Sequence, residues 1–189
     1  MSELLVEKCT VEEFSDFVKN SKTNTRYELI DGRVYAMTSP SVDHQSILLF
    51  VCDVFNNYFK NKNNDCRLFL SPLDVYLLDN TNDCKNVYQP DLFVVCDKNK
   101  IKSNGIYGSP DLVVEIISKS TASIDYVLKY NNYMKYGVKE YWIIDYKHDG
   151  IIVGTTREDY AAYSFSETVP SNLFPGLEVD FSEFKSDFQ

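Results

Sequence analysis

Apolar residues recur three or four positions apart in several stretches of the chain, which is the spacing of one face of an α-helix. The clearest stretch places Ile47, Val51 and Phe55 on one stripe and predicts a long helix packed against a core. Thr10, followed three positions later by Glu13, forms a capping-box pattern and predicts a short helix near the amino terminus. The predicted helices span residues 11–20, 41–60 and 121–136.

Other stretches are apolar over a few residues and are bounded by turn-forming residues, which is typical of β-strands. Asp31-Gly32 separates two such stretches and predicts a tight hairpin turn. Residues 97–110 are rich in Asn, Gly and Ser and are predicted to be a loop. The predicted strands span residues 25–30, 33–37, 67–78, 87–96, 111–118, 139–146, 151–154, 161–166 and 177–181. Together with the helices they predict a mixed α/β fold.

The composition is typical of a folded protein of one domain. The chain has 189 residues, of which 44% are hydrophobic. It has no apolar run long enough for a transmembrane helix, and its acidic amino-terminal segment differs from a signal peptide, so we expect no membrane association. The net charge of −9 opposes binding of nucleic acid over the whole surface, and such binding would require a local basic patch.

The cysteines predict neither a disulfide framework nor a zinc site. The chain has five of them, an odd number, and no two form a C-x-x-C pair. Cys52 and Cys96 are expected to be small apolar core residues. This cysteine usage is typical of a reducing compartment, and we expect a cytoplasmic protein.

Two carboxylates lie inside predicted strands that are otherwise apolar. Glu115 lies in VVEII, and Asp91 begins DLFVV. A buried carboxylate is costly unless a cation or hydrogen-bond donors compensate it, so Glu115 is either a core residue with a protein partner or part of a site. Asp111 lies about 13 Å from Glu115 along the strand, too far to share an ion, and is expected to be a turn or capping residue. Asp91, on a neighbouring strand, could share a divalent cation with Glu115.

Lys129 follows Asp125 by four residues on the third predicted helix. These residues can form an ordinary ion pair on a solvated helix face. Alternatively, this helix leans over the two carboxylates, and Lys129 helps to position and activate a water molecule. His44, at the start of the second predicted helix, is expected to be a capping or structural residue.

Five motifs in this sequence have the order and spacing of a known group of enzymes. They are YELIDGRVYAMT, QPDLFVV, SPDLVVEIIS, the pair Asp125-x-x-x-Lys129 and GVKEYWIID, and they cover roughly residues 27–176. Together they resemble the PD-(D/E)xK nuclease superfamily, and more narrowly its restriction-endonuclease branch called the Uma-two family. The resemblance implies an α/β restriction-endonuclease-like core, in which a central mixed β-sheet is flanked by helices and extended by β-hairpins. Residues 1–189 would form one domain, with an N-terminal helical extension (1–24) and a nuclease-like core (25–181).

The resemblance also implies which residues hold a metal ion. Asp91 matches the aspartate of the PD motif, and Glu115 matches the acidic residue of the (D/E)xK motif. With the backbone carbonyl of Ile116, these carboxylates would hold Mg²⁺ or Mn²⁺, which favour oxygen ligands.

The lysine of the motif requires a different match, because Ile117 stands where (D/E)xK has its lysine. The family is similar in carrying this lysine on the following helix, where Lys129 matches it. Lys119 is the alternative. Glu28 matches an extra acidic residue of the amino-terminal hairpin and would complete the catalytic group.

The function implied is that of a magnesium-dependent endonuclease that hydrolyses phosphodiester bonds of DNA. We expect a homodimer, because cutting both strands of a duplex usually requires two active sites. The alternatives are an inactive nucleic-acid-binding or protein-binding module of the same fold and a hydrolase of small phosphoesters, which the acidic net charge would suit better.

Overall fold

The computed structural model describes residues 3–6, 8–62, 65–79, 84–117, 128–156 and 158–184. Within them, three α-helices accompany two large β-sheets and a small two-stranded sheet, as the mixed α/β prediction requires. The helices are α1 (Val11–Asn20), α2 (Val42–Asn61) and α3 (Tyr130–Lys135), and the 3₁₀-helices are η1 (Lys98–Lys100) and η3 (Phe181–Glu183).

Both large sheets are mixed, since each contains one parallel pair among antiparallel neighbours. Sheet A has, in spatial order, β1 (Glu3–Val6), β3 (Arg33–Ala36), β2 (Tyr27–Ile30), β6 (Cys84–Tyr88), β5 (Val75–Leu78), β9 (Gly105–Tyr107) and β8 (Ile101–Lys102). Sheet B has β13 (Tyr160–Tyr163), β12 (Gly150–Gly154), β11 (Glu140–Asp145), β10 (Leu112–Ile116), β7 (Leu92–Val95) and β4 (Arg67–Leu70). The small sheet pairs β14 (Thr168–Pro170) with β15 (Glu178–Asp180).

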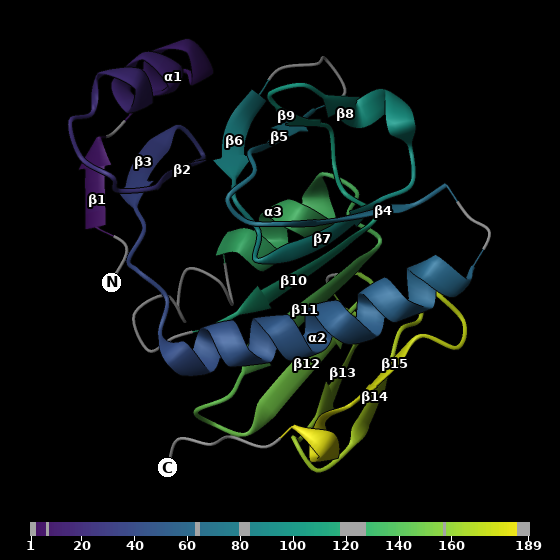
Figure 1. Cartoon of the computed structure of the whole chain (residues 1–189). Helices are drawn as coiled ribbons and strands as arrows, with labels where there is room; N and C mark the ends of the chain where they lie inside the picture. Colours follow the sequence, from purple (N-terminus) through teal and green to yellow (C-terminus); the bar gives the residue numbers. More distant parts are fainter. Residues whose placement is uncertain are drawn as a thin grey trace.

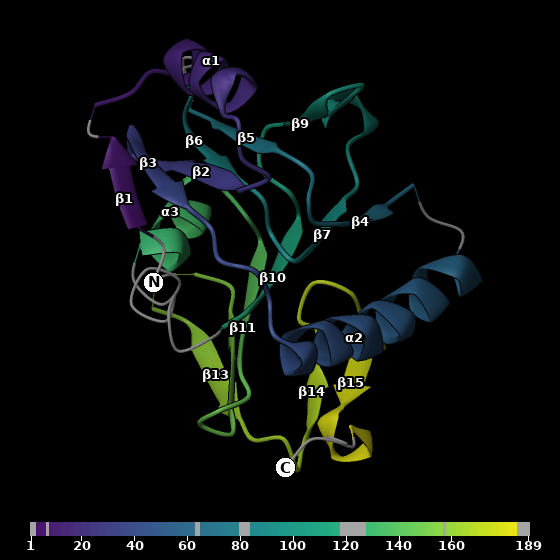
Figure 2. The same cartoon turned by 60° about the vertical axis from the view of Figure 1, so that its left-hand side comes forward.

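The elements form layers around sheet B (Figures 1 and 2). Helix α2 and the small sheet pack on one face of sheet B, where Phe55 meets the buried Trp142 with ring centroids 5.7 Å apart. The other face of sheet B packs against sheet A and α3. Helix α1 covers the outer face of sheet A. An apolar layer therefore fills the space between the two sheets, and a further apolar layer covers the outer face of each sheet.

Strand alternation assigns the residues of β10 to these two layers. Val114 and Ile116 belong to the core under α2, whereas Val113 and Ile117 belong to the core between the sheets. Glu115 shares the parity of the second pair and therefore faces sheet A. A polar residue on this face needs partners from sheet A or from α3.

Two predicted strands are wrong in extent, because each divides between the two sheets. Residues 67–78 form β4 in sheet B and β5 in sheet A, and residues 87–96 contain the end of β6 in sheet A and all of β7 in sheet B. Both breaks contain a proline, Pro72 and Pro90, which has no backbone N–H to continue a ladder. Asp91 therefore lies where the chain crosses from one sheet to the other.

Other differences concern short elements. The predicted loop at residues 97–110 contains η1, β8 and β9, and β1 and β14 had no counterpart among the predicted strands. The third predicted helix is described from residue 128 onward, and its earlier residues lie outside the described chain. Its predicted end at Gly137 is confirmed, since this glycine has φ +88° directly after the helix.

The expectation of no disulfide is wrong, because Cys66 and Cys96 are joined. Arg67 pairs with Val95 across β4 and β7, so Cys66 and Cys96 occupy the next position of the same register. The other cysteines, Cys9, Cys52 and Cys84, are thiols. Burial raises the pKa of Cys52, which keeps this thiol protonated at neutral pH.

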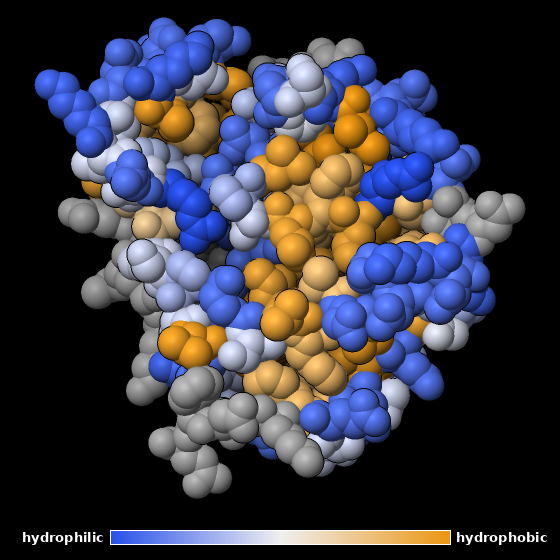
Figure 3. Space-filling view, viewed as in Figure 1, coloured by the Kyte–Doolittle hydropathy of each residue, from blue (hydrophilic) through white to orange (hydrophobic). Residues whose placement is uncertain are grey.

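The surface has an apolar band over the centre of one face, where α2 and β4 lie (Figure 3). On these two elements Val42, Leu49 and Leu70 are exposed. No helix in the described ranges combines the length and the apolar character that crossing a membrane requires.

Candidate active site

The structure places Asp91 and Glu115 side by side on neighbouring strands. Leu92 of β7 pairs with Val114 of β10 in antiparallel register, so the next position joins Asp91 with Glu115. The backbone N–H of Ile116 donates to Asp91 Oδ2 over 2.8 Å, which ties the two strands at this point. Asp91 is 8% exposed and Glu115 is 5% exposed, so both carboxylates are buried.

A second hydrogen bond to Asp91 comes from His44, near the start of α2. His44 Nε2 lies 3.0 Å from Asp91 Oδ2, and the ring is buried. Together with the Ile116 N–H, it fixes one carboxylate oxygen. The other, Oδ1, makes no hydrogen bond within the described residues.

Lys129 lies between Glu115 and Glu28, whose strand β2 belongs to the other sheet. Its ammonium donates to Glu115 Oε1 over 3.0 Å and to Glu28 Oε1 over 3.1 Å. The interpretation of Lys129 as part of an ion pair on a solvated face is wrong, because its side chain is 4% exposed. The second interpretation, in which Lys129 reaches the carboxylates, describes its position.

Glu28 reaches this group from the hairpin of β2 and β3. Its neighbours Leu29 and Ile30 pack on opposite faces of sheet A, so Glu28 faces away from α1 and toward the space between the sheets. Glu28 Oε1 also accepts from the backbone N–H of Gln89 over 3.0 Å. Glu28 is therefore held both by the chain segment that leads to Asp91 and by Lys129.

Tyr133, one turn after Lys129 in α3, completes the surroundings of Glu115. Its hydroxyl donates to Glu115 Oε1 over 3.1 Å. Complete burial, and secondarily the charge of Glu115, raise the pKa of Tyr133 well above its usual value. The hydroxyl therefore stays protonated and acts as a donor, which orients the carboxylate.

A buried network supports the lysine from the side of β6. Asn132 Nδ2 donates to the Tyr88 hydroxyl over 2.9 Å, and that hydroxyl donates to Asn86 Oδ1 over 3.2 Å. Burial raises the pKa of Tyr88, so it remains neutral. Lys129 Nζ lies 5.6 Å from the centre of the Tyr88 ring, within the range of a cation–π interaction.

Some residues considered from the sequence lie elsewhere. Asp111 is buried just before β10, at the opposite end of this strand from Glu115. It accepts hydrogen bonds from the Cys96 N–H and from Lys139 Nζ, both over 2.7 Å, and so has the structural role expected of it. Lys119 and Asp125 lie outside the described residues.

Two contacts of the site go beyond the predictions from the sequence. His44 was assigned a structural role, although it contacts Asp91 directly. The QPD motif assigns no role to Gln89, whose backbone N–H donates to Glu28. The polar residue His44 on the otherwise apolar stripe of α2 is the signal that could have revealed the first contact.

The donor set fits a cation that keeps several water ligands. Within the described ranges, no group of three or more His, Cys, Asp or Glu side chains is arranged to enclose a metal. Asp91 and Glu115 together offer hard carboxylate oxygens, and the chain beside them offers the Ile116 carbonyl. Mg²⁺ is typically bound by one or two carboxylates with several waters, so this sparse set suits it.

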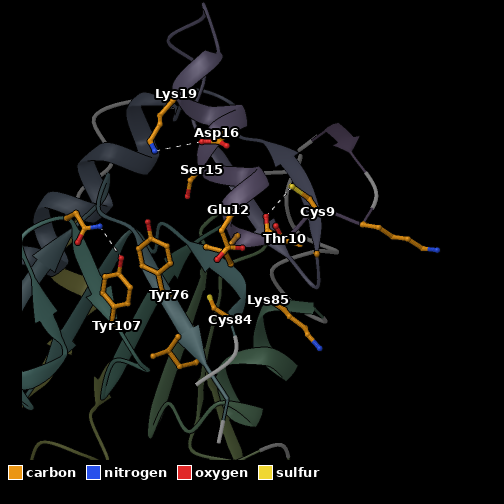
Figure 4. Close-up of a pocket in the computed structure, with 15 residues that line it drawn as sticks. Cys9, Thr10, Glu12, Ser15, Asp16, Lys19, Tyr76, Cys84, Lys85 and Tyr107 are labelled. Atoms are coloured by element: carbon orange, nitrogen blue, oxygen red, sulfur yellow. Dashed lines mark hydrogen bonds and ion pairs between the residues drawn. The ribbon is translucent and has the colours of Figure 1, made fainter. Parts of the chain in front are cut away.

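A separate pocket lies between α1 and the outer face of sheet A, which faces away from sheet B (Figure 4). It has a volume of about 1210 Å³ and is lined by Tyr76 and Tyr107, whose rings stack with centroids 4.5 Å apart. Glu12, Asp16 and Lys19 of α1 form its other wall. It contains none of the site residues predicted from the sequence.

The model of the Uma2 family, described as "Putative restriction endonuclease", matches residues 11–182. The chain belongs to the Uma2 family. The resemblance inferred from its five motifs is therefore confirmed.

Two other comparisons found similar proteins. A crystal structure from Anabaena variabilis, titled a putative nuclease belonging to DUF820, superposes with a TM-score of 0.74 at 20% sequence identity. The match covers 92% of this chain and 96% of that chain, and it shows a common fold. An uncharacterized protein of Synechocystis sp. is 32% identical over 100 residues, or 53% of this chain. That match spans 50% of the relative's length.

Proposed function

We propose that this Uma2 protein is a nuclease that hydrolyses phosphodiester bonds of DNA with a divalent cation, Mg²⁺ or Mn²⁺. The observation that carries the proposal is the buried group of Asp91, Glu115 and Lys129, in which paired carboxylates adjoin an ammonium. The Uma2 description supports nuclease activity in general. The cation and the choice of DNA rest on the chemistry of the site and on the family resemblance.

Asp91, Glu115 and the Ile116 carbonyl would hold the cation. Bound there, it would supply a Lewis acid that polarises the phosphoryl group and lowers the pKa of a water molecule. His44 and the Ile116 N–H immobilise Asp91 Oδ2, so that the carboxylate has a fixed orientation before the substrate arrives. Tyr133 does the same for Glu115.

Lys129 would orient the attacking water and offset the negative charge that develops on the phosphoryl oxygens. Glu28 and Glu115 hold its ammonium from two sides, which fixes the position of the cationic group. Glu28 is thus the positioning residue for Lys129. With a cation bound, Glu28 would hold it through a water molecule.

Purified protein should cleave plasmid DNA and DNA oligonucleotides in Mg²⁺ or Mn²⁺ and should lose this activity in EDTA, with recovery when metal is restored. Asp91→Asn should abolish cleavage and weaken Mn²⁺ binding in calorimetry, since it removes one of the two carboxylate ligands. Asp53→Asn, on the exposed side of α2, is the matched control and should leave both unchanged. Cleavage that persists in EDTA, or in Asp91→Asn, would contradict the proposal.

The same assay separates the alternative functions. A model phosphodiester such as bis-p-nitrophenyl phosphate, hydrolysed while DNA and RNA remain intact, would identify a small-phosphoester hydrolase. DNA binding without hydrolysis in any metal would identify a binding module. Cleavage of RNA in preference to DNA would show that RNA is the substrate and would still support metal-dependent phosphodiester hydrolysis.

A homodimer is part of this proposal, because one chain supplies one such group and a duplex has two strands to cut. Light scattering of the purified chain at micromolar concentration should give twice the mass of 21.8 kDa. A monomeric mass together with double-strand cleavage would contradict the predicted dimer.

A further inference from the structure

A groove of about 630 Å³ opens beside the candidate active site. Three parts of the chain form its walls, namely residues 24–26 before β2, residues 37–40 between β3 and α2, and residues 70–72 at the end of β4. The first turns of α2 contribute Gln45 and Leu48. The groove thus lies where sheet A, sheet B and the start of α2 meet.

Two hydrogen bonds join the walls of the groove to the site. Gln45 Nε2 lies 3.4 Å from Nδ1 of His44, whose other nitrogen contacts Asp91. On the opposite wall, the backbone N–H of Ser71 donates to the Asp91 carbonyl over 3.2 Å. The groove is therefore linked to the Asp91 carboxylate through His44, and to the Asp91 main chain through Ser71.

The charge of the groove is opposite to that of the whole chain. The net charge is −9, yet no aspartate or glutamate is among the described residues that line the groove. Its lining has a single charged side chain, Arg26, which is partly buried. Within the described chain, no carboxylate pairs with this guanidinium and no hydrogen bond engages it.

The remaining lining residues suit a nucleotide unit. Thr25, Ser39 and Ser71 offer hydroxyl groups that can donate to phosphate oxygens. Leu48 and Leu70 offer aliphatic surface for a sugar or a base. A guanidinium has the planar fork of donors that matches phosphate oxygens, and it binds phosphate most strongly where no carboxylate competes for it.

We propose that Arg26 binds a backbone phosphate of the DNA strand, next to the phosphodiester that Asp91 and Glu115 would hydrolyse. This inference rests on the proposed function, since it assigns the groove to the same substrate. Arg26 would thereby supply a local cationic contact for nucleic acid on a chain whose net charge is −9.

The test measures binding without cleavage. Fluorescein-labelled DNA, as a 12-nucleotide single strand and as the corresponding duplex, is titrated in EDTA and followed by fluorescence anisotropy. Arg26→Gln should weaken binding about 10-fold and lower the salt dependence by about one released counterion. Arg26→Lys, which keeps the charge but loses the fork, should recover part of the affinity.

Arg33→Gln is the matched control, because Arg33 is exposed on β3 and does not line the groove. It removes the same charge and should change the affinity less than about 2-fold. Equal losses in both variants, no loss in Arg26→Gln, or no binding of either DNA by the native chain would overturn the inference. Circular dichroism of each variant checks that it is folded.

The outcomes also distinguish this inference from the proposed function. Binding that depends on Arg26, with no cleavage in Mg²⁺ or Mn²⁺, would support the groove and overturn the nuclease. Metal-dependent cleavage in which Arg26→Gln keeps the native KM and affinity would support the nuclease and overturn the groove. If Arg26→Gln weakens the binding of one DNA form more than that of the other, the more strongly affected form is the one that occupies the groove.

Discussion

Replacing Lys129 by methionine is expected to abolish phosphodiester cleavage and to lower the free energy of unfolding by about 3–5 kcal/mol. Methionine keeps the length of the side chain but removes the ammonium that compensates two carboxylates. Glu28 and Glu115 are 4% and 5% exposed, so their charges would then remain buried without this cation. Urea unfolding measures the stability, and cleavage of a labelled oligonucleotide in Mg²⁺ measures the activity.

Two further variants make this prediction specific. Lys135→Met, on the exposed side of α3, should change the stability by less than about 0.5 kcal/mol and leave cleavage intact. Mn²⁺ binding should persist in Lys129→Met, because Asp91 and Glu115 are retained. If Lys129→Met cleaves normally while Lys119→Met does not, the catalytic role belongs to Lys119.

Truncation of Glu140 to alanine should destabilise the protein by about 3–5 kcal/mol without altering the residues of the candidate site. Glu140 is fully buried in β11. Its carboxylate accepts from Trp142 Nε1 over 2.6 Å and from the backbone N–H groups of Asn172 and Leu173 over 2.7 Å each. The alanine variant leaves these donors without this acceptor and opens a cavity.

Thermal and urea unfolding measure this loss, and the tryptophan fluorescence reports on it locally because Trp142 is the one tryptophan of the chain. Glu178→Ala, at an exposed position of β15, is the control and should cost less than about 0.5 kcal/mol. A loss below about 1 kcal/mol in Glu140→Ala would show that water satisfies the donors instead.

The residues of the candidate site were predictable because their chemistry conflicts with their surroundings. Glu115 is a carboxylate within a buried strand, and Asp91 begins another, so each requires a partner whatever the fold. Because Asp91 is expected on a strand next to that of Glu115, the two carboxylates are expected to lie close enough to share a cation. Their shared register shows that the two carboxylates are neighbours, as that argument required.

What the sequence did not reveal depends on pairing between distant segments. The division of residues 67–78 into two sheets follows from where each half finds a hydrogen-bonding neighbour, which periodicity does not encode. The Cys66–Cys96 disulfide depends on the register of β4 against β7. The contact of His44 with Asp91 depends on how α2 crosses the end of sheet B, and a helical stripe alone does not fix that crossing.

The ion pairs of Lys129 connect the two sheets. Glu28 belongs to sheet A and Glu115 to sheet B, and the first contact joins residues 101 positions apart in the chain. Any partial opening that separates the sheets also disperses the charges that perform the proposed chemistry. Enzymatic activity would therefore require an intact interface between the sheets. A mutation or a proteolytic cut that loosens this interface far from the site would abolish the activity before the rest of the fold is lost.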